Sequence, residues 1–137
     1  LEDIMIPRSQ MVMLEKQQTL EQMVAVIEKF EYTRYPIIDI TKKKNDVIGF
    51  INTKEMLTGI AAGRSNDVTA FIQDILRFKQ STAIKEVFLK MQQTRRHMAV
   101  VTDGKGVIIG LVTMEDILSE IVGEIQDEDN GEMVYST

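Results

Sequence analysis

Apolar residues recur at the spacing of one helix face in two separate stretches of the chain. The spacing predicts an amphipathic helix in each, because side chains three and four residues apart lie on the same side of a helix. Thr19 and Gln22 are placed like a capping box at the start of the first helix. The apolar faces consist of Leu20, Met23, Val24, Ile27 and Phe30 in the first stretch and of Ile84, Val87, Phe88 and Met91 in the second.

A short apolar strand follows each predicted helix, and after a turn comes a second strand and another helix. The strand Met98–Val101 matches Tyr35–Ile38. The closing segment gives the clearest match, since Gly110–Leu118 repeats the pattern of Gly49–Leu57 at a distance of 61 positions. The chain therefore contains two copies of one unit, with a period of about sixty residues.

Each copy follows the approximate order β-α-β-β-α. Polar or glycine-containing residues at Lys42–Asp46 and Asp103–Gly106 predict the turn between its last two strands. Such a unit has a sheet with helices on one face and cannot bury all of its apolar surface alone. The predicted fold class is therefore α/β, with tandem repeats packed against each other as a pseudo-twofold pair.

Three parts are predicted along the 137 residues. Residues 1–66 form the first repeat with an N-terminal segment, residues 67–125 form the second repeat, and residues 126–137 form an acidic linker or tail. The chain begins at Leu1 without a start methionine or a basic-then-apolar leader, which favours an origin inside a longer protein with neighbouring domains.

Composition and charge narrow the function classes. Hydrophobic residues make up 44% and charged residues 27%, as in ordinary globular domains, and no apolar stretch approaches the roughly 20 residues of a membrane helix. The absence of cysteine excludes disulfides and thiolate chemistry and is consistent with the cytoplasm. The net charge is −5, and residues 115–132 carry eight acidic side chains without Lys or Arg, which argues against nucleic acid as a partner.

The ending Gly-apolar-apolar-Thr-x-x-Asp at Gly110–Asp116 makes the repeat resemble a pair of CBS domains, also called a Bateman module. Asp3–Arg8, Tyr32–Pro36, Arg96–Val101 and Gly110–Glu124 resemble the CBS pair of the CorC, hemolysin C and cyclin M group. This resemblance covers nearly the whole chain. It implies a cytoplasmic module, often attached to a membrane domain, in a protein associated with magnesium and cobalt efflux.

Thr113 and Asp116 are the strongest candidate ligand contacts. A hydroxyl and a carboxylate at a strand-to-helix junction can both accept hydrogen bonds from ribose hydroxyls. The spacing by itself favours a simpler role, in which Thr113 caps the helix and Asp116 interacts with the helix dipole. The CBS resemblance implies that both residues hold ribose, and one threonine can cap and bind at once.

The corresponding residues of the first copy are Asn52 and Glu55, which depart from the Thr and Asp pattern. The longer Glu55 side chain is expected to crowd a ribose, whereas Asn52 and Glu55 together make a good capping box. We therefore predict one competent nucleotide site, built around the second copy, and a degenerate site in the first.

The resemblance places Tyr32, Thr33 and Arg34 beside the same cleft. An aromatic ring can pack on adenine and a guanidinium can bind phosphate oxygens, although an ion pair between Arg34 and a carboxylate is the simpler alternative. In many relatives the residue that corresponds to Ile6 is Thr, which stands before Pro. In this chain Ile6 offers only apolar contact or backbone polar groups. This departure leaves open whether the bound nucleotide is ATP or AMP.

A second departure concerns the segment between the repeats, because Arg77–Ser81 is shorter than the usual segment of the family. The first strand of the second copy is therefore predicted to be short or missing.

The expected function is a regulatory module that binds ATP or another adenine nucleotide, with or without Mg²⁺, and catalyses nothing. His97 is the only histidine, and no nucleophile or acid-base group is paired with it. The alternative is a constitutive dimerisation scaffold with a degenerate nucleotide site. CBS pairs commonly form flat homodimers through helices, and the candidate surface consists of Ile117, Leu118, Ile121, Val122 and Ile125.

Overall fold

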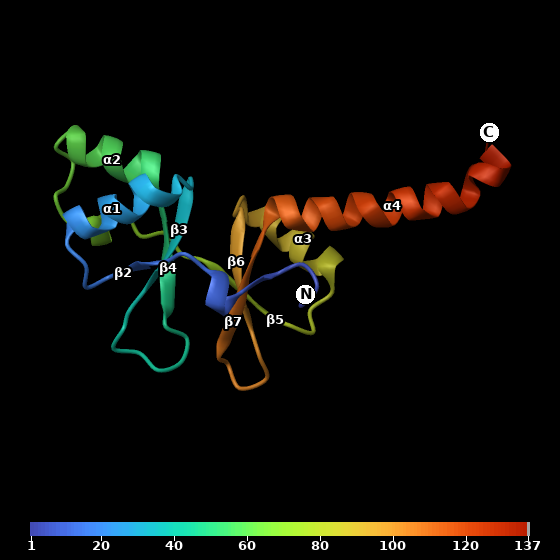
Figure 1. Cartoon of the computed structure of the whole chain (residues 1–137), viewed down its shortest axis with the longest axis horizontal. Coiled ribbons are helices and arrows are strands. Elements are labelled where there is room, and N and C mark those ends of the chain that lie inside the picture. Colours follow the sequence, from blue (N-terminus) through green and yellow to red (C-terminus); the bar gives the residue numbers. More distant parts are fainter. Residues whose placement is uncertain (137) are drawn as a thin grey trace.

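The computed structural model describes the backbone of residues 1–136 and the side chains of residues 1–125. The side chains of the predicted acidic linker or tail at 126–137 therefore lie outside the described residues. The elements of the chain are β1 (Ile6–Pro7), a 3-10 helix η1 (Arg8–Gln10), β2 (Leu14–Glu15), α1 (Leu20–Phe30), β3 (Arg34–Ile38), β4 (Val47–Asn52), α2 (Thr53–Ala61), η2 (Val68–Phe71), β5 (Leu76–Lys79), α3 (Ile84–Thr94), β6 (Met98–Thr102), β7 (Ile108–Thr113) and α4 (Met114–Ser136) (Figure 1).

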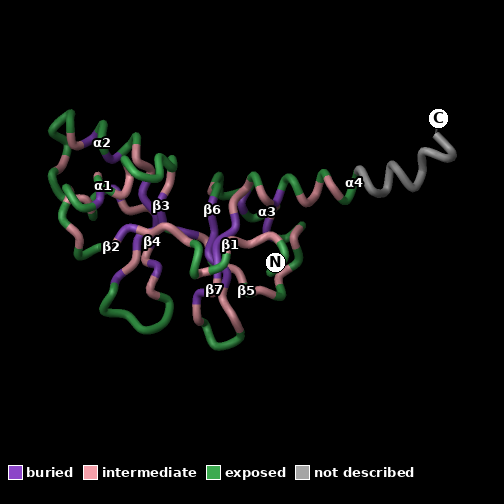
Figure 2. The backbone as a smooth tube through the Cα atoms, viewed as in Figure 1, coloured by how far each residue is buried: buried purple, intermediate pink, exposed green. Residues whose placement is uncertain are grey.

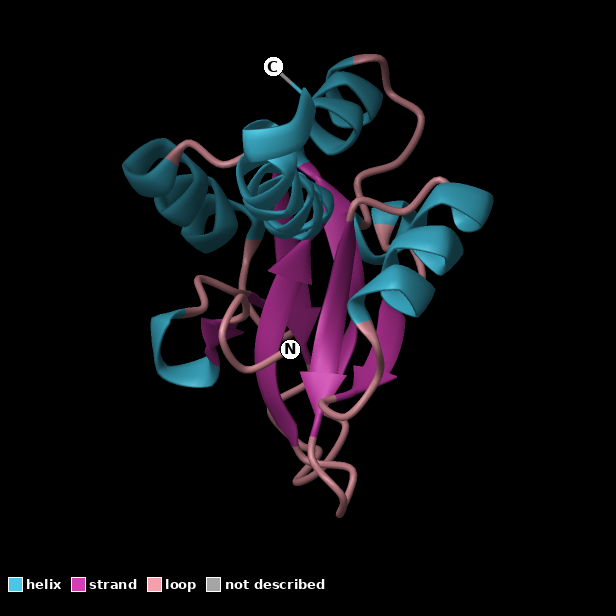
Figure 3. Cartoon of the chain, turned by 90° about the vertical axis from the view of Figure 1, so that its right-hand side faces the viewer, coloured by secondary structure: helices cyan, strands magenta, loops and turns pink. Residues whose placement is uncertain are grey.

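The predicted α/β fold with two β-α-β-β-α copies is confirmed. The first copy runs β2-α1-β3-β4-α2 and forms a sheet with strand order β2-β3-β4. The second copy runs β5-α3-β6-β7-α4, and its sheet has the order β1-β7-β6-β5. The turns of both β-hairpins lie at the end of the molecule away from the helices (Figure 3). Among the described residues, no helix combines the length and the apolar character needed to cross a membrane.

The register of the hairpins corrects the predicted match between the two copies. Arg34 pairs with Asn52, and Met98 pairs with Thr113. Since Asn52 and Thr113 are equivalent, Met98 corresponds to Arg34, and the predicted match of Met98 with Tyr35 is wrong by one residue. The cause is the first hairpin turn, which is longer than the second. A slip of one residue would exchange the two faces of a strand, so this correction decides which side chains meet at the cleft.

The prediction of a short or missing first strand in the second copy is also wrong. Strand β5 has four residues and runs parallel to β6, whereas its counterpart β2 has two. Leu76 and Phe78 are half-buried while Arg77 and Lys79 are exposed, which is the alternation of a strand with one covered face.

The N-terminal segment, which the sequence assigned to the first repeat, packs on the second. Ile6 pairs with Leu111 and Pro7 with Gly110, so β1 adds an edge strand to the sheet of the second copy. Gly110 permits this close approach, because a Cβ atom there would lie 2.5 Å from the Met5 sulfur and 2.8 Å from the Ile6 carbonyl oxygen. The boundary between residues 66 and 67 stays a prediction.

Apolar side chains form three clusters, one under the helices of each copy and one between the two sheets. Figure 2 shows that the buried residues gather along the central strands. Strand β6 contributes to two of them, because Ala99 and Val101 face the helices while Met98 and Val100 face the other sheet. Both faces of the central strands are therefore buried, and the packing of the two sheets forms the body of the fold. The central cluster consists of Val47, Phe50, Ile75, Met98, Val100, Ile108 and Leu111.

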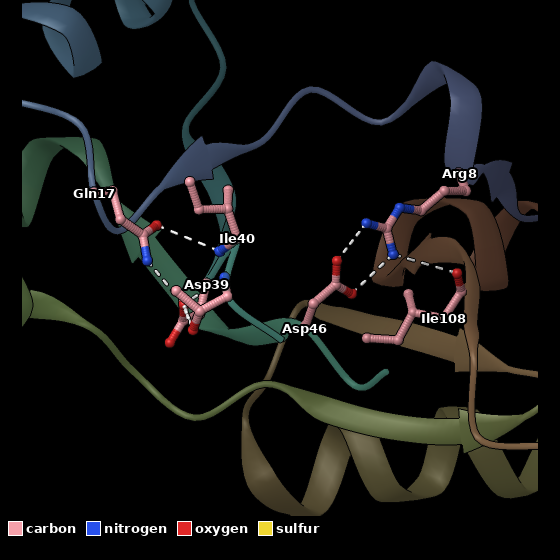
Figure 4. Close-up of polar contacts among 7 residues, drawn as sticks. Arg8, Gln17, Asp39, Ile40, Asp46 and Ile108 are labelled. Atoms are coloured by element: carbon pink, nitrogen blue, oxygen red, sulfur yellow. Dashed lines mark hydrogen bonds and ion pairs between the residues drawn. The ribbon is translucent and has the colours of Figure 1, made fainter. Parts of the chain in front are cut away.

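The first hairpin turn is anchored by Asp39, which is buried. Its Oδ1 atom accepts hydrogen bonds from Gln17 Nε2 at 2.8 Å, from the Thr41 amide at 3.0 Å and from the Thr41 hydroxyl at 2.6 Å (Figure 4). These donors, with Thr41 first, lower the pKa of Asp39 to about 2. The folded hairpin turn therefore favours the ionised form of the Asp39 carboxyl group.

We expect acid to destabilise the fold through Asp39. Because its pKa is lower in the folded than in the unfolded chain, its contribution is complete above about pH 4 and is lost as the pH falls toward 2. Melting temperatures across this range should therefore fall less steeply for Asp39→Asn than for the wild type. The exposed Asp74→Asn is the control, and equal slopes in the wild type and Asp39→Asn would contradict the prediction.

Candidate functional site

A cleft of about 360 Å³ lies where the N-terminal segment meets both copies. The N-terminal segment, the first copy and the second copy all contribute to its walls. Most of the lining is apolar, and the polar groups come from a glutamine, a tyrosine and an arginine. The lining residues are Ile6, Gln10, Met11, Val12, Tyr32, Arg34, Pro36, Met98 and Leu111.

Strand alternation explains why these side chains converge. Arg34 and Pro36 are two residues apart on β3 and point to the same side of the sheet. Met98 begins β6 and Leu111 lies near the end of β7, and both face the sheet of the first copy. The cleft is thus the outer edge of the space between the sheets, at the end nearest the helices.

Arg34 is the one lining residue with a positive charge. Its side chain is half-buried, and its guanidinium makes no hydrogen bond or ion pair with any described residue. The ion pair with a carboxylate, which the sequence left as the simpler alternative, is therefore absent from this part of the chain. A cation with free donors in an otherwise apolar cleft is suited to an anionic ligand.

Tyr32 stands beside Arg34 and is 53% exposed. The ring stacks on Phe30 with centroids 6.0 Å apart, and it tilts against Tyr35 at 5.7 Å. The Tyr35 hydroxyl accepts a hydrogen bond of 2.9 Å from the Tyr32 amide, which holds this turn in place. A fixed and exposed aromatic ring is suited to a planar ligand group.

Neither Thr113 nor Asp116 belongs to the set of residues that line the cleft. Thr113 follows Leu111 by two residues on the same face of β7 and pairs with Met98, and both of these neighbours line the cleft. The Thr113 hydroxyl accepts a hydrogen bond of 3.2 Å from the Asp116 amide, which confirms the predicted cap. The Asp116 carboxylate has no hydrogen-bond partner among the described residues.

The structure brings together three of the seven predicted site residues as direct lining, namely Ile6, Tyr32 and Arg34. Pro7 pairs with Gly110, and the Thr33 carbonyl accepts a hydrogen bond of 3.0 Å from the Thr53 amide. Sequence reasoning missed the other lining residues. Strand alternation from Arg34 would have found Pro36, but no local pattern marks the remaining ones, which are Gln10, Met11, Val12, Met98 and Leu111.

At the position related to the cleft by the pseudo-twofold, side chains of the two copies bond to one another. Gln73 bridges to Phe50 as Ile6 pairs with Leu111, so Gln73 takes the place of Ile6 in the first copy. Its side-chain amide donates a hydrogen bond of 3.0 Å to the Glu55 carboxylate. Asn52 caps α2 as predicted, but Glu55 bonds to Gln73 rather than completing the predicted capping box.

Arg96, which belongs to the second copy, also bonds to Gln73. Its guanidinium donates a hydrogen bond of 2.9 Å to Gln73 Oε1 and lies 5.7 Å from the centre of the Phe50 ring. Arg96 occupies the place that Tyr32 has at the open cleft, since each stands two residues before its strand. A connected chain of polar groups, Glu55, Gln73 and Arg96, thus lies at the counterpart of the cleft.

Metal-ligating groups do not gather in the part of the chain that the structure describes. No three His, Asp or Glu side chains there lie close enough to hold a metal ion.

Similar proteins were found by sequence. A family model described as CBS domain matches residues 68–123. The UPF0053 protein YhdP of Bacillus subtilis (strain 168) is 40% identical over 129 residues, which cover 92% of this chain and 29% of YhdP. The magnesium and cobalt efflux protein CorC of Vibrio cholerae is 38% identical over 130 residues, which cover 92% of this chain and 43% of CorC. The chain thus spans less than half of the length of these relatives.

Similar structures agree with these matches. A CBS-domain crystal structure from Clostridium difficile 630 has a TM-score of 0.78 and 30% identity, covering 89% of this chain and 92% of that one. The CBS domain of a bacterial CNNM/CorC family Mg²⁺ transporter in complex with ATP has a TM-score of 0.77 and 28% identity, covering 88% and 85%. The class of protein is therefore a tandem pair of repeats, with a cleft large enough for a small ligand where the two copies meet. The chain belongs to the CBS-domain family, and its relatives include UPF0053 and CorC proteins.

Proposed function

We propose that this chain is the regulatory module of a CorC-like protein and that it binds one adenine nucleotide, with ATP as the expected ligand, in the cleft. The observation that supports this proposal most strongly is the unpaired Arg34 guanidinium beside the exposed Tyr32 in a largely apolar cleft. The CBS structure solved with ATP supports the nucleotide class. Because no nucleophile or acid-base pair lines the cleft, the module regulates and does not catalyse.

Three parts of the nucleotide match three parts of the site. The apolar lining and Tyr32 suit the adenine, and Arg34 suits the phosphates because its donors are free. Thr113, which pairs with the lining residue Met98, and Asp116, whose amide bonds to Thr113, suit the ribose hydroxyls. The cap made by Thr113 leaves the Asp116 carboxylate free to accept. Mg²⁺ would enter with the phosphates.

Regulation requires that the ligand bind two arrangements of the module with unequal affinity. The cleft is lined by both copies and by the N-terminal segment, so a bound nucleotide contacts parts of the fold that can shift against each other. In the parent protein this change would reach neighbouring domains, and the greater lengths of the relatives leave room for such domains. The proposed place of the module is the cytoplasmic side of a membrane domain linked to magnesium and cobalt efflux.

Calorimetry with ATP, ADP, AMP and adenosine, each with and without Mg²⁺, tests this function. We expect saturable binding of ATP and weaker binding of adenosine, because adenosine lacks the phosphates that Arg34 would contact. If none of the four ligands binds to the folded chain, the nucleotide proposal is wrong. A dimer that persists in that case would favour the constitutive scaffold.

The stoichiometry of binding is expected to be one nucleotide per chain. The open cleft offers one site, whereas at its counterpart Glu55, Gln73 and Arg96 are hydrogen-bonded to one another. Titration of a known protein concentration by calorimetry measures this ratio. Two equivalent sites would contradict this prediction and would show that a ligand displaces Glu55, Gln73 and Arg96.

Helices α2 and α4 are the proposed homodimer surface. Leu57 and Leu118 occupy equivalent positions in the two copies, and each is 41% exposed. On α4, Val122 and Ile125 are about half exposed and continue the face of Leu118. Ile117, which the sequence placed on this surface, is fully buried in the core of its own copy, and Ile121 packs against that core.

Charge on this surface is expected to separate the dimer. Val122→Glu combined with Leu118→Glu should give a folded monomer, because two carboxylates would be buried at the contact. Light scattering measures the mass, and Leu89→Glu on the exposed face of α3 is the matched control. A dimer of unchanged mass in the double variant would remove α4 from the interface.

A further inference from the structure

Residues 6–12 form one wall of the cleft and are called the wall segment here. They supply four of its lining side chains, Ile6, Gln10, Met11 and Val12. At its start the wall segment pairs with β7 of the second copy, and at its end it leads into β2, which pairs with β3 of the first copy. The wall segment therefore crosses from one copy to the other, and its position sets the width of the cleft.

Little local structure holds the wall segment. Strand β1 has two residues, and the 3-10 helix η1 has three and receives no side-chain hydrogen bond from its N-cap, Pro7. Short 3-10 turns have poor hydrogen-bond geometry. The wall segment must therefore be fixed by contacts with the rest of the fold.

Arg8 provides such a contact to both copies. Its Nη1 and Nη2 atoms donate to the two carboxylate oxygens of Asp46 at 2.9 and 2.6 Å, and Nη1 also reaches the Ile108 carbonyl oxygen at 3.4 Å (Figure 4). Asp46 lies directly before β4 and Ile108 begins β7, so Arg8 joins the starts of equivalent strands. The Asp46 side chain is only 14% exposed, and this is the only ion pair among the described residues.

Arg77 makes a related contact on the opposite side of the molecule. It donates to the Val47 carbonyl, the counterpart of the Ile108 carbonyl, and to the Ile75 carbonyl at 2.9 Å. Its Nε atom donates to the neutral side chain of Asn45 at 2.7 Å. Arg77 lies on β5, away from the wall segment, and lines no part of the cleft. It is therefore a matched control for Arg8.

We propose that Arg8 and Asp46 form a clamp that positions the wall segment and so couples occupancy of the cleft to the hairpin turn at residues 39–46. The clamp rests on the proposed function only for the identity of the ligand. A ligand that binds more tightly when the clamp holds the wall segment in place strengthens the clamp, and by linkage the clamp strengthens ligand binding by the same factor. Arg8 and Asp46 act as positioning residues, since neither lines the cleft.

Calorimetry on Arg8→Gln and Asp46→Asn tests the coupling. Loss of the clamp should weaken ATP and adenosine by the same factor, about tenfold, because it acts through the wall and not on the phosphates. Arg77→Gln should leave both affinities unchanged. The exchanged pair, Arg8→Asp with Asp46→Arg, should recover part of the affinity that each single variant loses.

Three results would overturn the clamp. A much larger loss for ATP than for adenosine in Arg8→Gln would mean that Arg8 contacts phosphate directly. An equal loss in Arg77→Gln would mean that the effect is general destabilisation. Single variants with wild-type affinities would mean that the wall needs no clamp.

Hydrogen exchange, measured first without ligand and then with ATP, separates the clamp from the nucleotide proposal. Arg8→Gln should speed exchange in the wall segment, whereas Arg77→Gln should not. In the wild type, ATP should slow exchange in residues 39–46, and this protection should be lost in Arg8→Gln. If no nucleotide binds the wild type, the proposed function fails, yet unchanged exchange of the wall segment in Arg8→Gln would still refute the clamp.

Discussion

Replacing Gly110 with alanine is expected to displace β1 from the sheet of the second copy and to lower the free energy of unfolding by about 1–3 kcal/mol. A Cβ atom at this position would lie 2.8 Å from the Ile6 carbonyl oxygen, which is backbone and cannot rotate away. The Met5 sulfur at 2.5 Å would also have to move. Because Ile6 lines the cleft, nucleotide affinity should fall together with stability.

Gly104→Ala is the control for this substitution. Gly104 lies in the second hairpin turn, and nothing stands within 4 Å of a Cβ atom built there. Denaturant titration of both variants measures the free energy of unfolding, and calorimetry measures the affinity. If Gly110→Ala is as stable as Gly104→Ala, the contact between β1 and β7 is looser than the structure describes.

Local signals in the sequence were sufficient where the interaction itself is local. The capping box at Thr19 and Gln22 is present, with the Thr19 hydroxyl accepting from the Gln22 amide at 3.2 Å and the Gln22 side chain accepting from the Thr19 amide at 2.9 Å. The two partners are three residues apart, so their identity and spacing define the structure. The cap at Thr113 is predictable for the same reason.

Strand partners that lie far apart in the chain could not be predicted in this way. Ile6 and Leu111 are paired although most of the chain separates them, and no periodicity near either residue marks the partner. The one-residue error in matching Met98 with Tyr35 has a related cause, because the copies differ in the length of a hairpin turn and a single distance between equivalent residues does not hold across it. The predicted fold class is correct in spite of both errors, because it depends only on the order of the elements along the chain.

The candidate site was predicted in part for similar reasons. Tyr32 and Arg34 were found through the family resemblance, and the structure places both at the cleft. The hydrogen-bonded counterpart of the cleft was missed, because its recognition requires knowing that Gln73 takes the place of Ile6. The expectation that Glu55 crowds a ribose stays a prediction, and the structure adds that the Glu55 carboxylate accepts a hydrogen bond from Gln73.

Asp116→Ala and Arg34→Ala are expected to weaken ATP binding about tenfold or more, through different parts of the nucleotide. Asp116→Ala removes an acceptor for ribose hydroxyls, so adenosine and ATP should lose similar affinity. Arg34→Ala removes donors to phosphate, so ATP should lose affinity and adenosine should not. Hydrogen bonds to charged groups contribute roughly 1.5–3 kcal/mol, and about 1.4 kcal/mol corresponds to a factor of ten in affinity.

Each variant has a control that shares its general effects. Glu115→Ala removes a carboxylate from the same first turn of α4 as Asp116, so it reproduces the loss of a favourable interaction with the helix dipole. Arg64→Ala removes an exposed arginine outside the cleft and reproduces the change in net charge. Melting curves of all four variants separate a loss of binding from a loss of stability.

Adenosine decides between the two roles. If folded Asp116→Ala binds ATP as the wild type does, the carboxylate has no part in ribose recognition and Thr113 and Asp116 serve only the helix start. If Arg34→Ala weakens adenosine as much as ATP, the guanidinium shapes the cleft and does not contact phosphate. A selective loss of ATP in Arg34→Ala, together with a shared loss in Asp116→Ala, would place the phosphates at β3 and the ribose at the start of α4.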